Sequence, residues 1–223
     1  MISVIGIGNG ASAIAQKFSG MPQYEVYTLN NQITKNSKFK HKLKKHATPE
    51  ECEENTPDLK KFFANVRDSV QVFIIGSSYS SNYTLGILEQ IKDKSIELFY
   101  VRPDTELLTG IPKLMETATF GVLQEYARSG LFNSITLISN LHLEKVLGDV
   151  SVKNYFDSLN DSIYSTVHYL NYFNYTDPEI GNVSKAGPIN RIRTVGFLNM
   201  EDIEEKWLFD LDMERELCYY LCI

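Results

Sequence analysis

The sequence begins with MISVIGIGNGASAIAQK (residues 1–17), and this stretch decides the fold. The β-branched run at 2–5 predicts a buried strand, and residues 13–18 place apolar side chains at helical spacing. The turn between them, here called the glycine loop (residues 6–12), offers unpaired backbone N–H groups beside the positive end of a helix dipole. It therefore favours an anion such as a nucleotide phosphate, and its glycines allow close approach. The competing interpretation is a tight strand–helix turn without a ligand.

Composition and charge are those of an ordinary globular protein. The 223 residues fit one large domain, or one domain with an appendage, and 43% of them are hydrophobic against 22% charged. The net charge of −6 argues against general nucleic-acid binding. No run of 18 apolar residues occurs and no basic leader precedes the first strand. We therefore expect no membrane span and no signal peptide, and we predict a cytoplasmic protein.

The three cysteines, Cys52, Cys218 and Cys222, do not pair with histidines at metal-ligand spacing. Cys218 and Cys222 could share one helix face, but two thiols do not make a zinc site. We therefore expect no metal site in the chain, and free thiols in a reducing compartment.

Strands and helices are predicted to alternate along most of the chain. Apolar, β-rich runs predict further strands at 24–29, 70–75, 96–101 and 134–139. Helical spacing and capping residues predict helices that begin at Pro49 and that cover 57–67, 83–92, 110–128, 141–147 and 151–173. This order predicts the α/β class, as a Rossmann-like three-layer domain with a mostly parallel sheet and a long central helix. Ligands in such folds bind at the carboxyl ends of the strands, where the sequence places the turns at Gly8, Asn30, Gly76, Pro103 and Asn140.

Three other segments have two interpretations each. The turn GSSYSSN, here called the serine loop (residues 76–82), follows a strand and precedes a helix, so it is either a second phosphate site or a polar turn. Residues 35–45 contain six lysines, which form either a solvated loop or a flexible basic segment that meets a polyphosphate or an acidic partner. Past residue 175 prolines and glycines interrupt the pattern, and residues 207–223 could form a strand or a short helix.

The order and spacing of these turns resemble the nucleotide-binding domain of the tubulin/FtsZ family over about residues 1–205. Residues 4–12 are similar to the family's first glycine loop, and the serine loop falls where the family has G-G-G-T-G-[ST]-G. Arg102-Pro103 resembles the loop after the family's fourth strand. The resemblance implies that the phosphates are bound by Gly8, Asn9, Gly10, Ala11, Gly76, Ser77, Ser80 and Ser81.

Two later motifs resemble the parts of the family's domain that contact the guanine base and a neighbouring subunit. Ile138-Ser139-Asn140 matches the strand end whose Asn contacts guanine, and residues 155–161 resemble the start of the central helix, where Asp161 would also contact the base. Residues 196–204 lie where the family has N-x-D-x-x-D, the loop that completes the active site of the next subunit. Glu201 and Glu204 take the catalytic positions there. The competing interpretation is a solvated acidic helix start.

Two departures from the family pattern matter. The serine loop keeps one signature glycine, Gly76, and a Cβ at the other positions impedes the approach of backbone N–H groups to phosphate. The chain also ends about twenty residues after the acidic segment, where the family continues into a second domain. We therefore divide the chain into a nucleotide-binding domain at 1–175 and a C-terminal extension at 176–223. The small size suggests a divergent, reduced relative of the kind that a phage encodes.

The resemblance implies a protein that binds GTP or GDP with Mg²⁺ and has little or no GTPase activity, although it is GTPase-like in fold. Its partners would be further copies of itself or another protein subunit, in an assembly or a larger complex. A competing hypothesis is an interaction module, in which the old nucleotide face and the charged segments dock a partner. An NAD-type Rossmann enzyme is the weaker alternative. Gly6, Gly8 and Ala11 fit G-x-G-x-x-A, but the strand at 24–29 ends on Asn30-Asn31 and not on the acid that holds a ribose.

Overall fold

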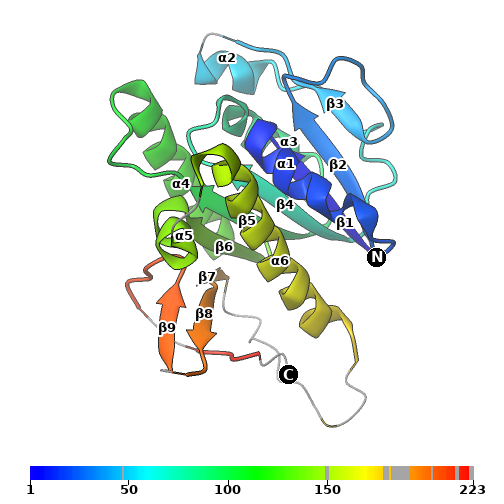
Figure 1. Ribbon diagram of the computed structural model, residues 1–223. Coiled ribbons are helices and arrows are strands. Elements are labelled where there is room, and N and C mark those ends of the chain that lie inside the picture. Colours follow the sequence, from blue (N-terminus) through cyan, green and yellow to red (C-terminus); the bar gives the residue numbers. More distant parts are fainter. Residues whose placement is uncertain are drawn as a thin grey trace.

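A parallel sheet forms the centre of the computed structural model, which describes residues 1–46, 48–148, 151–177, 181, 191–201, 203–213 and 216–220. Seven strands pair in the order β3-β2-β1-β4-β5-β6-β7, and every pairing between them is parallel (Figure 1). Their bounds are β1 Ile2–Ile7, β2 Tyr24–Asn30, β3 Lys40–Lys42, β4 Ser69–Ile75, β5 Ser95–Arg102, β6 Ser134–Ser139 and β7 Ile192–Thr194. The predicted α/β class is confirmed.

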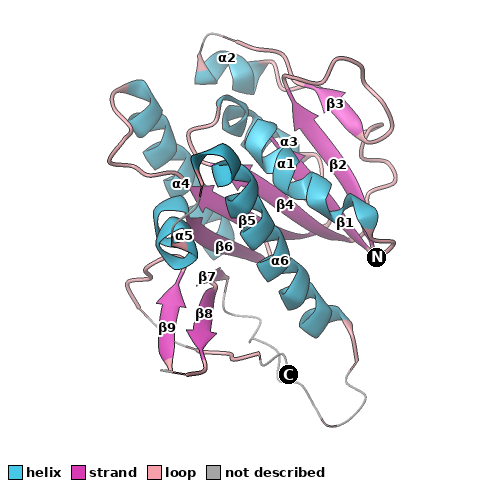
Figure 2. Ribbon diagram, viewed as in Figure 1, coloured by secondary structure: helices cyan, strands magenta, loops and turns pink. Residues whose placement is uncertain are grey.

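Helices cover both faces of the sheet, as Figure 2 shows. The helices α1 (Asn9–Lys17), α5 (Asn140–Leu147) and α6 (Tyr155–Tyr175) bury side chains in one apolar cluster. On the opposite face, α2 (Pro49–Glu54), α3 (Thr84–Glu89) and α4 (Ile111–Ser129) bury side chains in the other cluster. Short 3₁₀ turns lie at Phe18–Gly20, Tyr79–Tyr83 and Val152–Asn154. The three-layer arrangement with a long helix, α6, is therefore as predicted.

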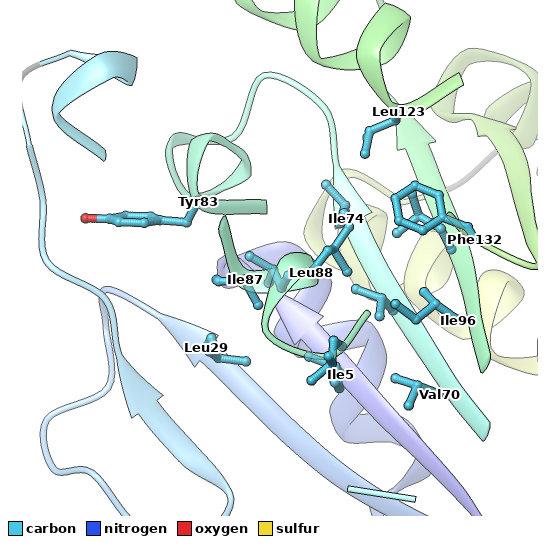
Figure 3. Close-up of a cluster of buried hydrophobic side chains, with 14 of the residues drawn as sticks. Ile5, Leu29, Val70, Ile74, Tyr83, Ile87, Leu88, Ile96, Leu123 and Phe132 are labelled. Carbon is cyan, nitrogen blue, oxygen red and sulfur yellow. The ribbon is translucent and has the colours of Figure 1, made fainter. Parts of the chain in front are cut away.

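The central strands are buried on both faces, which explains their nearly continuous apolar sequences. All six residues of β1 are buried. Figure 3 shows one of the two clusters, in which Ile5 and Ile74 from the sheet meet Ile87 and Leu88 of α3. β-branched side chains pack well on a pleated surface, so these runs form strands although each is short.

Helix ends follow the capping residues in the sequence. Thr48 accepts a hydrogen bond from the backbone N–H of Glu51 at 3.2 Å, and Pro49 occupies the first turn of α2. Gly130 ends α4 in the left-handed conformation, with φ of 84°. These boundaries were readable because capping uses side chains within a few residues of the helix end.

Residues 57–67 form irregular chain and turns and not the predicted helix. Leu59, Phe63 and Val66 have helical spacing and are buried against the sheet as that spacing predicts. The backbone N–H of Leu59, however, donates to the side chain of Gln90 at 2.6 Å. Contacts from a distant helix therefore hold this segment in turns, which local sequence does not reveal.

The chain past residue 190 differs from the predicted pattern. Residues 196–207 form an antiparallel hairpin of β8 (Gly196–Asn199) and β9 (Glu204–Trp207), so the acidic segment at 201–205 does not start a helix. Leu208 joins this hairpin to the sheet, because its N–H donates to Val195 and its carbonyl accepts from Ser139. Pro178, Gly187, Pro188, Asp202 and Cys222 lie outside the described residues.

Candidate functional site

The glycine and serine loops lie at the topological switch point of the sheet. From β1 the chain moves to β2 on one side, whereas from β4 it moves to β5 on the other side. Because β1 and β4 are neighbours, the loops at their carboxyl ends flank the place where connections diverge. Open α/β sheets bind ligands at this place. The structure thus brings together the two phosphate candidates from the sequence.

Two positions in the glycine loop require glycine because of the backbone around them. Gly8 has φ of 99°, which side chains rarely allow, and its N–H donates to the carbonyl of Leu29 at 2.8 Å. A Cβ on Gly6 would lie 2.5 Å from the carbonyl oxygen of Ala11, so α1 packs directly on the strand. The first-turn N–H groups of Asn9, Gly10 and Ala11 have no acceptor within the helix. N–H groups in this position, at the start of a nine-residue helix, are of the kind that can bind an anion.

The serine loop packs against the glycine loop. A Cβ built on Gly8 would lie 3.3 Å from the Oγ of Ser78 and 3.5 Å from the Cβ of Ser80. The Ser78 Oγ is buried and has no hydrogen-bond partner among the described residues. Ser81 donates to the carbonyl of Ser78 at 2.5 Å, which tightens the loop, and Ser77 is left-handed with φ of 55°. One polar group of the serine loop therefore lies next to the glycine loop with no partner in the described part of the chain.

Close packing explains why a glycine occupies position 76. A Cβ at this position would collide with the Tyr100 hydroxyl and would lie 3.0 Å from Cδ of Pro103. The hydroxyl of Tyr100 donates to Glu116 at 3.4 Å, and burial beside that carboxylate raises the pKa of Tyr100. The Nε of Arg102 donates to Glu116 at 2.9 Å, and the Glu116 side chain is fully buried. An ion pair between the buried carboxylate of Glu116 and the partly exposed guanidinium of Arg102 thus supports the loops after β4 and β5.

Sequence reasoning missed Glu116, because its partners come from another element. Residues 110–128 were predicted as a helix, but the apolar positions Ile111 and Leu114 are 68% and 71% exposed, and α4 instead buries Glu116, Leu123 and Ala127. The only cue was Arg102 at the end of a buried strand, whose charge needs a counterion.

Tyr79 extends from the serine loop toward α2. Its hydroxyl accepts from the backbone N–H of His46, and burial near Cys52 raises the pKa of Tyr79 to about 12. Tyr83 donates to the carbonyl of Lys44 at 3.1 Å. Tyr79 and Tyr83 therefore tie the serine loop and the residue after it to the backbone of residues 44–46, and the ring of Tyr79 extends toward that backbone.

The two residues predicted to contact the base, Asn140 and Asp161, lie further from the glycine loop than the serine loop does. Asn140 is the first residue of α5 at the carboxyl end of β6, two strand spacings or about 10 Å from β4. Asp161 pairs with Lys17 at 2.7 Å, as does Asp157. Because Lys17 ends α1, Asp161 lies about one length of that helix, roughly 13 Å, from Gly8. Their contacts with a base stay predictions.

A further aromatic–amide pair lies at the start of α6. Phe156 is 74% exposed, and Asn160 follows one turn later on the same side of the helix. Tyr155 joins this end to α5 through a 3.0 Å hydrogen bond to Glu144. An exposed ring beside an amide suits stacking and hydrogen bonding to a planar ligand. Sequence reasoning did not single out this pair, although the spacing Phe-x-x-x-Asn at the predicted helix start could have indicated it.

The predicted catalytic residues lie beyond the far edge of the sheet. Glu201 occupies the hairpin turn, and Glu204 starts β9, where Lys206 lies 3.5 Å from it. From β1 to β7 there are four strand spacings, or about 19 Å. Within one copy the structure therefore does not bring Glu201 and Glu204 to the glycine loop, and their catalytic role stays a prediction.

Neither a metal-binding cluster nor a membrane-spanning helix is found in the described part of the chain. It holds no group of three or more His, Cys, Asp or Glu side chains arranged for a metal ion. None of its helices is both long and apolar enough to cross a membrane.

No protein-family model matches the sequence, and no curated protein matches it either. Solved structures do match. FtsZ from M. jannaschii, described as an empty dimer, superposes with a TM-score of 0.63 at 16% identity and covers 82% of this chain. TubZ from Bacillus thuringiensis serovar israelensis, in a GTPγS-form protofilament, superposes with a TM-score of 0.61 at 16% identity and covers 80% of this chain. CetZ from Methanosaeta thermophila superposes with a TM-score of 0.56 at 13% identity and also covers 80% of this chain.

These likenesses establish the fold. The parallel sheet flanked by helices is that of the tubulin/FtsZ GTPase domain. This chain spans 57% of the FtsZ and TubZ chains and 56% of the CetZ chain. The resemblance inferred from the turns is therefore confirmed for the fold, at an identity that agrees with strong divergence.

Proposed function

We propose that this chain binds a guanine nucleotide at the glycine loop and hydrolyses it slowly or not at all. The observation that carries the proposal is the buried hydroxyl of Ser78, which has no hydrogen-bond partner among the described residues and lies close to Gly8 at the switch point. Leaving a buried hydroxyl unpaired costs about 1–3 kcal/mol, and a phosphate oxygen would satisfy it. The first-turn N–H groups of Asn9, Gly10 and Ala11 supply further donors on the same side.

The choice of a guanine nucleotide rests on the fold. The similar TubZ structure is described as a GTPγS-form protofilament. In this chain the amides of the glycine loop would hold the phosphates, while Asn140 and Asp161 would contact the base. Mg²⁺ is commonly held by substrate phosphates and water, so a magnesium ion would enter with the nucleotide.

Slow hydrolysis follows from the serine loop and the hairpin. In the serine loop, the one glycine is used for packing against Tyr100, and side chains stand at the other positions. Glu201 and Glu204 could act only on a nucleotide held by another copy, because they lie beyond the opposite edge of their own sheet. Both features support a reduced rate of phosphate release.

We expect GDP and GTP to bind in calorimetric titrations at about 100 μM protein, a concentration that reveals micromolar affinity. Phosphate release from GTP is expected to stay near background across a protein concentration series. Absence of binding heat for both nucleotides, with and without Mg²⁺, would remove nucleotide binding as the function. A rate per subunit that rises with concentration and is lost in Glu204→Gln would instead make the chain a working GTPase.

An interaction module is the second candidate, and the ion pairs of Lys17 favour it. Asp161 and Asp157 both lie 2.7 Å from the Lys17 amine, so the carboxylate predicted to contact the base already has a partner. Co-purification tests this candidate. A stoichiometric protein partner together with a 260/280 nm absorbance ratio that indicates no retained nucleotide would support the module and contradict the nucleotide proposal.

Asp161→Ala separates base contact from folding. We expect guanine nucleotide affinity to fall about tenfold, because a hydrogen bond to a charged group contributes about 1.5–3 kcal/mol. The free energy of unfolding should change by less than about 1 kcal/mol, since the Asp161 side chain is 59% exposed, Lys17 keeps its pair with Asp157, and alanine favours helix. Asp157→Ala is the matched control, because it removes the other carboxylate from Lys17. Equal binding losses in both variants would show that Asp161 acts through Lys17 and not on the base.

A further inference from the structure

Helix α4 is inverted relative to an ordinary surface helix. Its inward face buries a charged residue, Glu116, together with Leu123 and Ala127. Its outward face begins with Ile111 and Leu114, which are 68% and 71% exposed. A surface helix normally turns its apolar residues to the core and its charged residues to water. The fold therefore leaves an apolar helix face open to solvent.

The outward residues continue along the helix at a regular spacing. Ala118 and Gly121 follow Leu114, and both are exposed. Positions 111, 114, 118 and 121 alternate steps of three and four residues, which keeps them on one side of an α-helix. We call this face the α4 seam (Ile111, Leu114, Ala118 and Gly121). It extends along about 15 Å of the helix.

The two halves of the seam differ in the size of their side chains. Ile111 and Leu114 are large, and Leu107 in the loop before the helix is 79% exposed as well. At the other end, a Cβ built on Gly121 would meet nothing within 4 Å among the described residues, so packing within this chain does not require glycine there. A neighbouring helix can approach more closely where the side chains at the contact are small. Ala118 and Gly121 thus leave room for a second backbone.

The grouping of these side chains indicates a contact surface. Single exposed apolar side chains are normal on a protein, whereas a contiguous group marks an interaction site. Leu107, Ile111 and Leu114 lie within eight residues of one another, and Figure 1 shows the N-terminal half of α4 at the periphery of the molecule. Alternating steps of three and four are the pattern of helices that pack lengthwise against another helix. The occupant that fits the seam is therefore an α-helix with apolar residues at the same spacing.

The charge around the seam favours a basic occupant. Residues 104–128 contain four acidic and two basic side chains, and one of the acids, Glu116, is buried against Arg102. The acids outside the core then outnumber the bases, and these side chains are Asp104, Glu106 and Glu125 against Lys113 and Arg128. The whole chain carries a net charge of −6, so it attracts a cationic partner and repels a second copy of itself.

We propose that the α4 seam binds a basic, amphipathic α-helix of another protein. Leu107, Ile111 and Leu114 contact its apolar residues, and its backbone lies closest to α4 at Ala118 and Gly121. The inference goes beyond the proposed function, because α4 lies outside the glycine and serine loops and the contact needs no nucleotide.

The contact is small. A single helix on one helix face buries less than the roughly 1,200 Å² of a stable interface, so the complex is weak and reversible. We expect a dissociation constant of about 1–50 μM. Most of the affinity should come from the large side chains at the start of the seam, because a few buried anchors dominate such contacts.

Fluorescence anisotropy with labelled synthetic peptides tests the proposal on the nucleotide-free chain. The probe has about 18 residues, with Leu and Ala at steps of three and four and with Lys and Gln elsewhere. A second peptide has the same composition in scrambled order, so it keeps the charge but has no apolar face. A third has Glu in place of Lys. We expect the first peptide to bind at least about tenfold more tightly than either of the others.

Two variants separate binding from folding. Leu114→Gln should weaken binding of the basic peptide about tenfold and leave the thermal unfolding midpoint nearly unchanged, because this side chain is exposed. Gly121→Gln should weaken binding about fivefold but raise the midpoint, since glutamine favours helix more than glycine does. Met200→Gln is the matched control, because it removes an apolar side chain that is 66% exposed in the hairpin turn. It should bind the peptide like the unaltered chain.

NMR of the backbone amides locates the contact, and we expect the shifts caused by the basic peptide to concentrate at residues 107–125. Shifts confined to other residues, equal affinity for the scrambled peptide, equal loss in Met200→Gln, or no binding at about 500 μM would overturn the proposal. A chain that sediments as a dimer and becomes single in Leu114→Gln would show that a second copy occupies the seam, which also contradicts it. Because the protein is nucleotide-free, none of these results depends on whether it binds guanine nucleotide.

Discussion

Arg102→Ala is expected to lower the free energy of unfolding by about 3–5 kcal/mol, because it leaves a buried carboxylate without its counterion. The Glu116 side chain is fully buried, and its Oε1 accepts from Nε of Arg102 at 2.9 Å. The guanidinium also lies 4.5 Å from the ring centroid of Phe120, so its loss removes packing as well. Urea unfolding, with midpoints compared at constant slope, measures the change.

Two further variants make the Arg102 result specific. Arg128→Ala removes an exposed i,i+3 pair with Glu125 and should cost less than about 1 kcal/mol. Glu116→Gln in the Arg102→Ala background should recover much of the loss, because the buried charge is then absent. If Arg102→Ala costs no more than Arg128→Ala, the buried pair does not stabilise the loops after β4 and β5.

The central sheet could be predicted from the sequence because its information is local. The runs 2–5, 70–75, 96–101 and 134–139 are rich in β-branched and other apolar residues and are almost entirely buried, so periodicity and composition agree. β3 could not be predicted in this way. It has three residues, Lys40–Lys42, and it is a strand only because Thr28–Asn30 of β2 offer it hydrogen bonds.

The candidate site could be predicted in its backbone but not in its side-chain partners. The turn at Gly8 follows from glycine spacing, and the structure confirms that it adjoins the serine loop. The partners of Asp161 and Glu116 lie 144 and 14 residues away, in elements that meet only through the fold. Similarly, no local pattern shows that Tyr79 reaches His46 and not the glycine loop.

Asn9→Asp should change stability and nucleotide binding in opposite directions. Asn9 is exposed at the first position of α1, where a carboxylate interacts favourably with the helix dipole and contributes about 0.3–1 kcal/mol to folding. The same charge would lie beside the proposed phosphates. Two like charges about 5 Å apart near a protein surface repel by about 3 kcal/mol, so GDP affinity should fall at least tenfold.

Gln16→Glu provides the control for Asn9→Asp, since it adds the same charge to an exposed position on the same helix. Position 16 is seven residues, about 10 Å, further along α1, near the negative end of its dipole. This variant should therefore be slightly less stable and should bind GDP within about twofold of the unaltered chain, because salt screens a charge at that distance. Thermal unfolding and calorimetry on both variants separate the two effects. A more stable Asn9→Asp variant with undiminished GDP affinity would show that the positive end of α1 is free of phosphate, and the nucleotide proposal would then be wrong at its central contact.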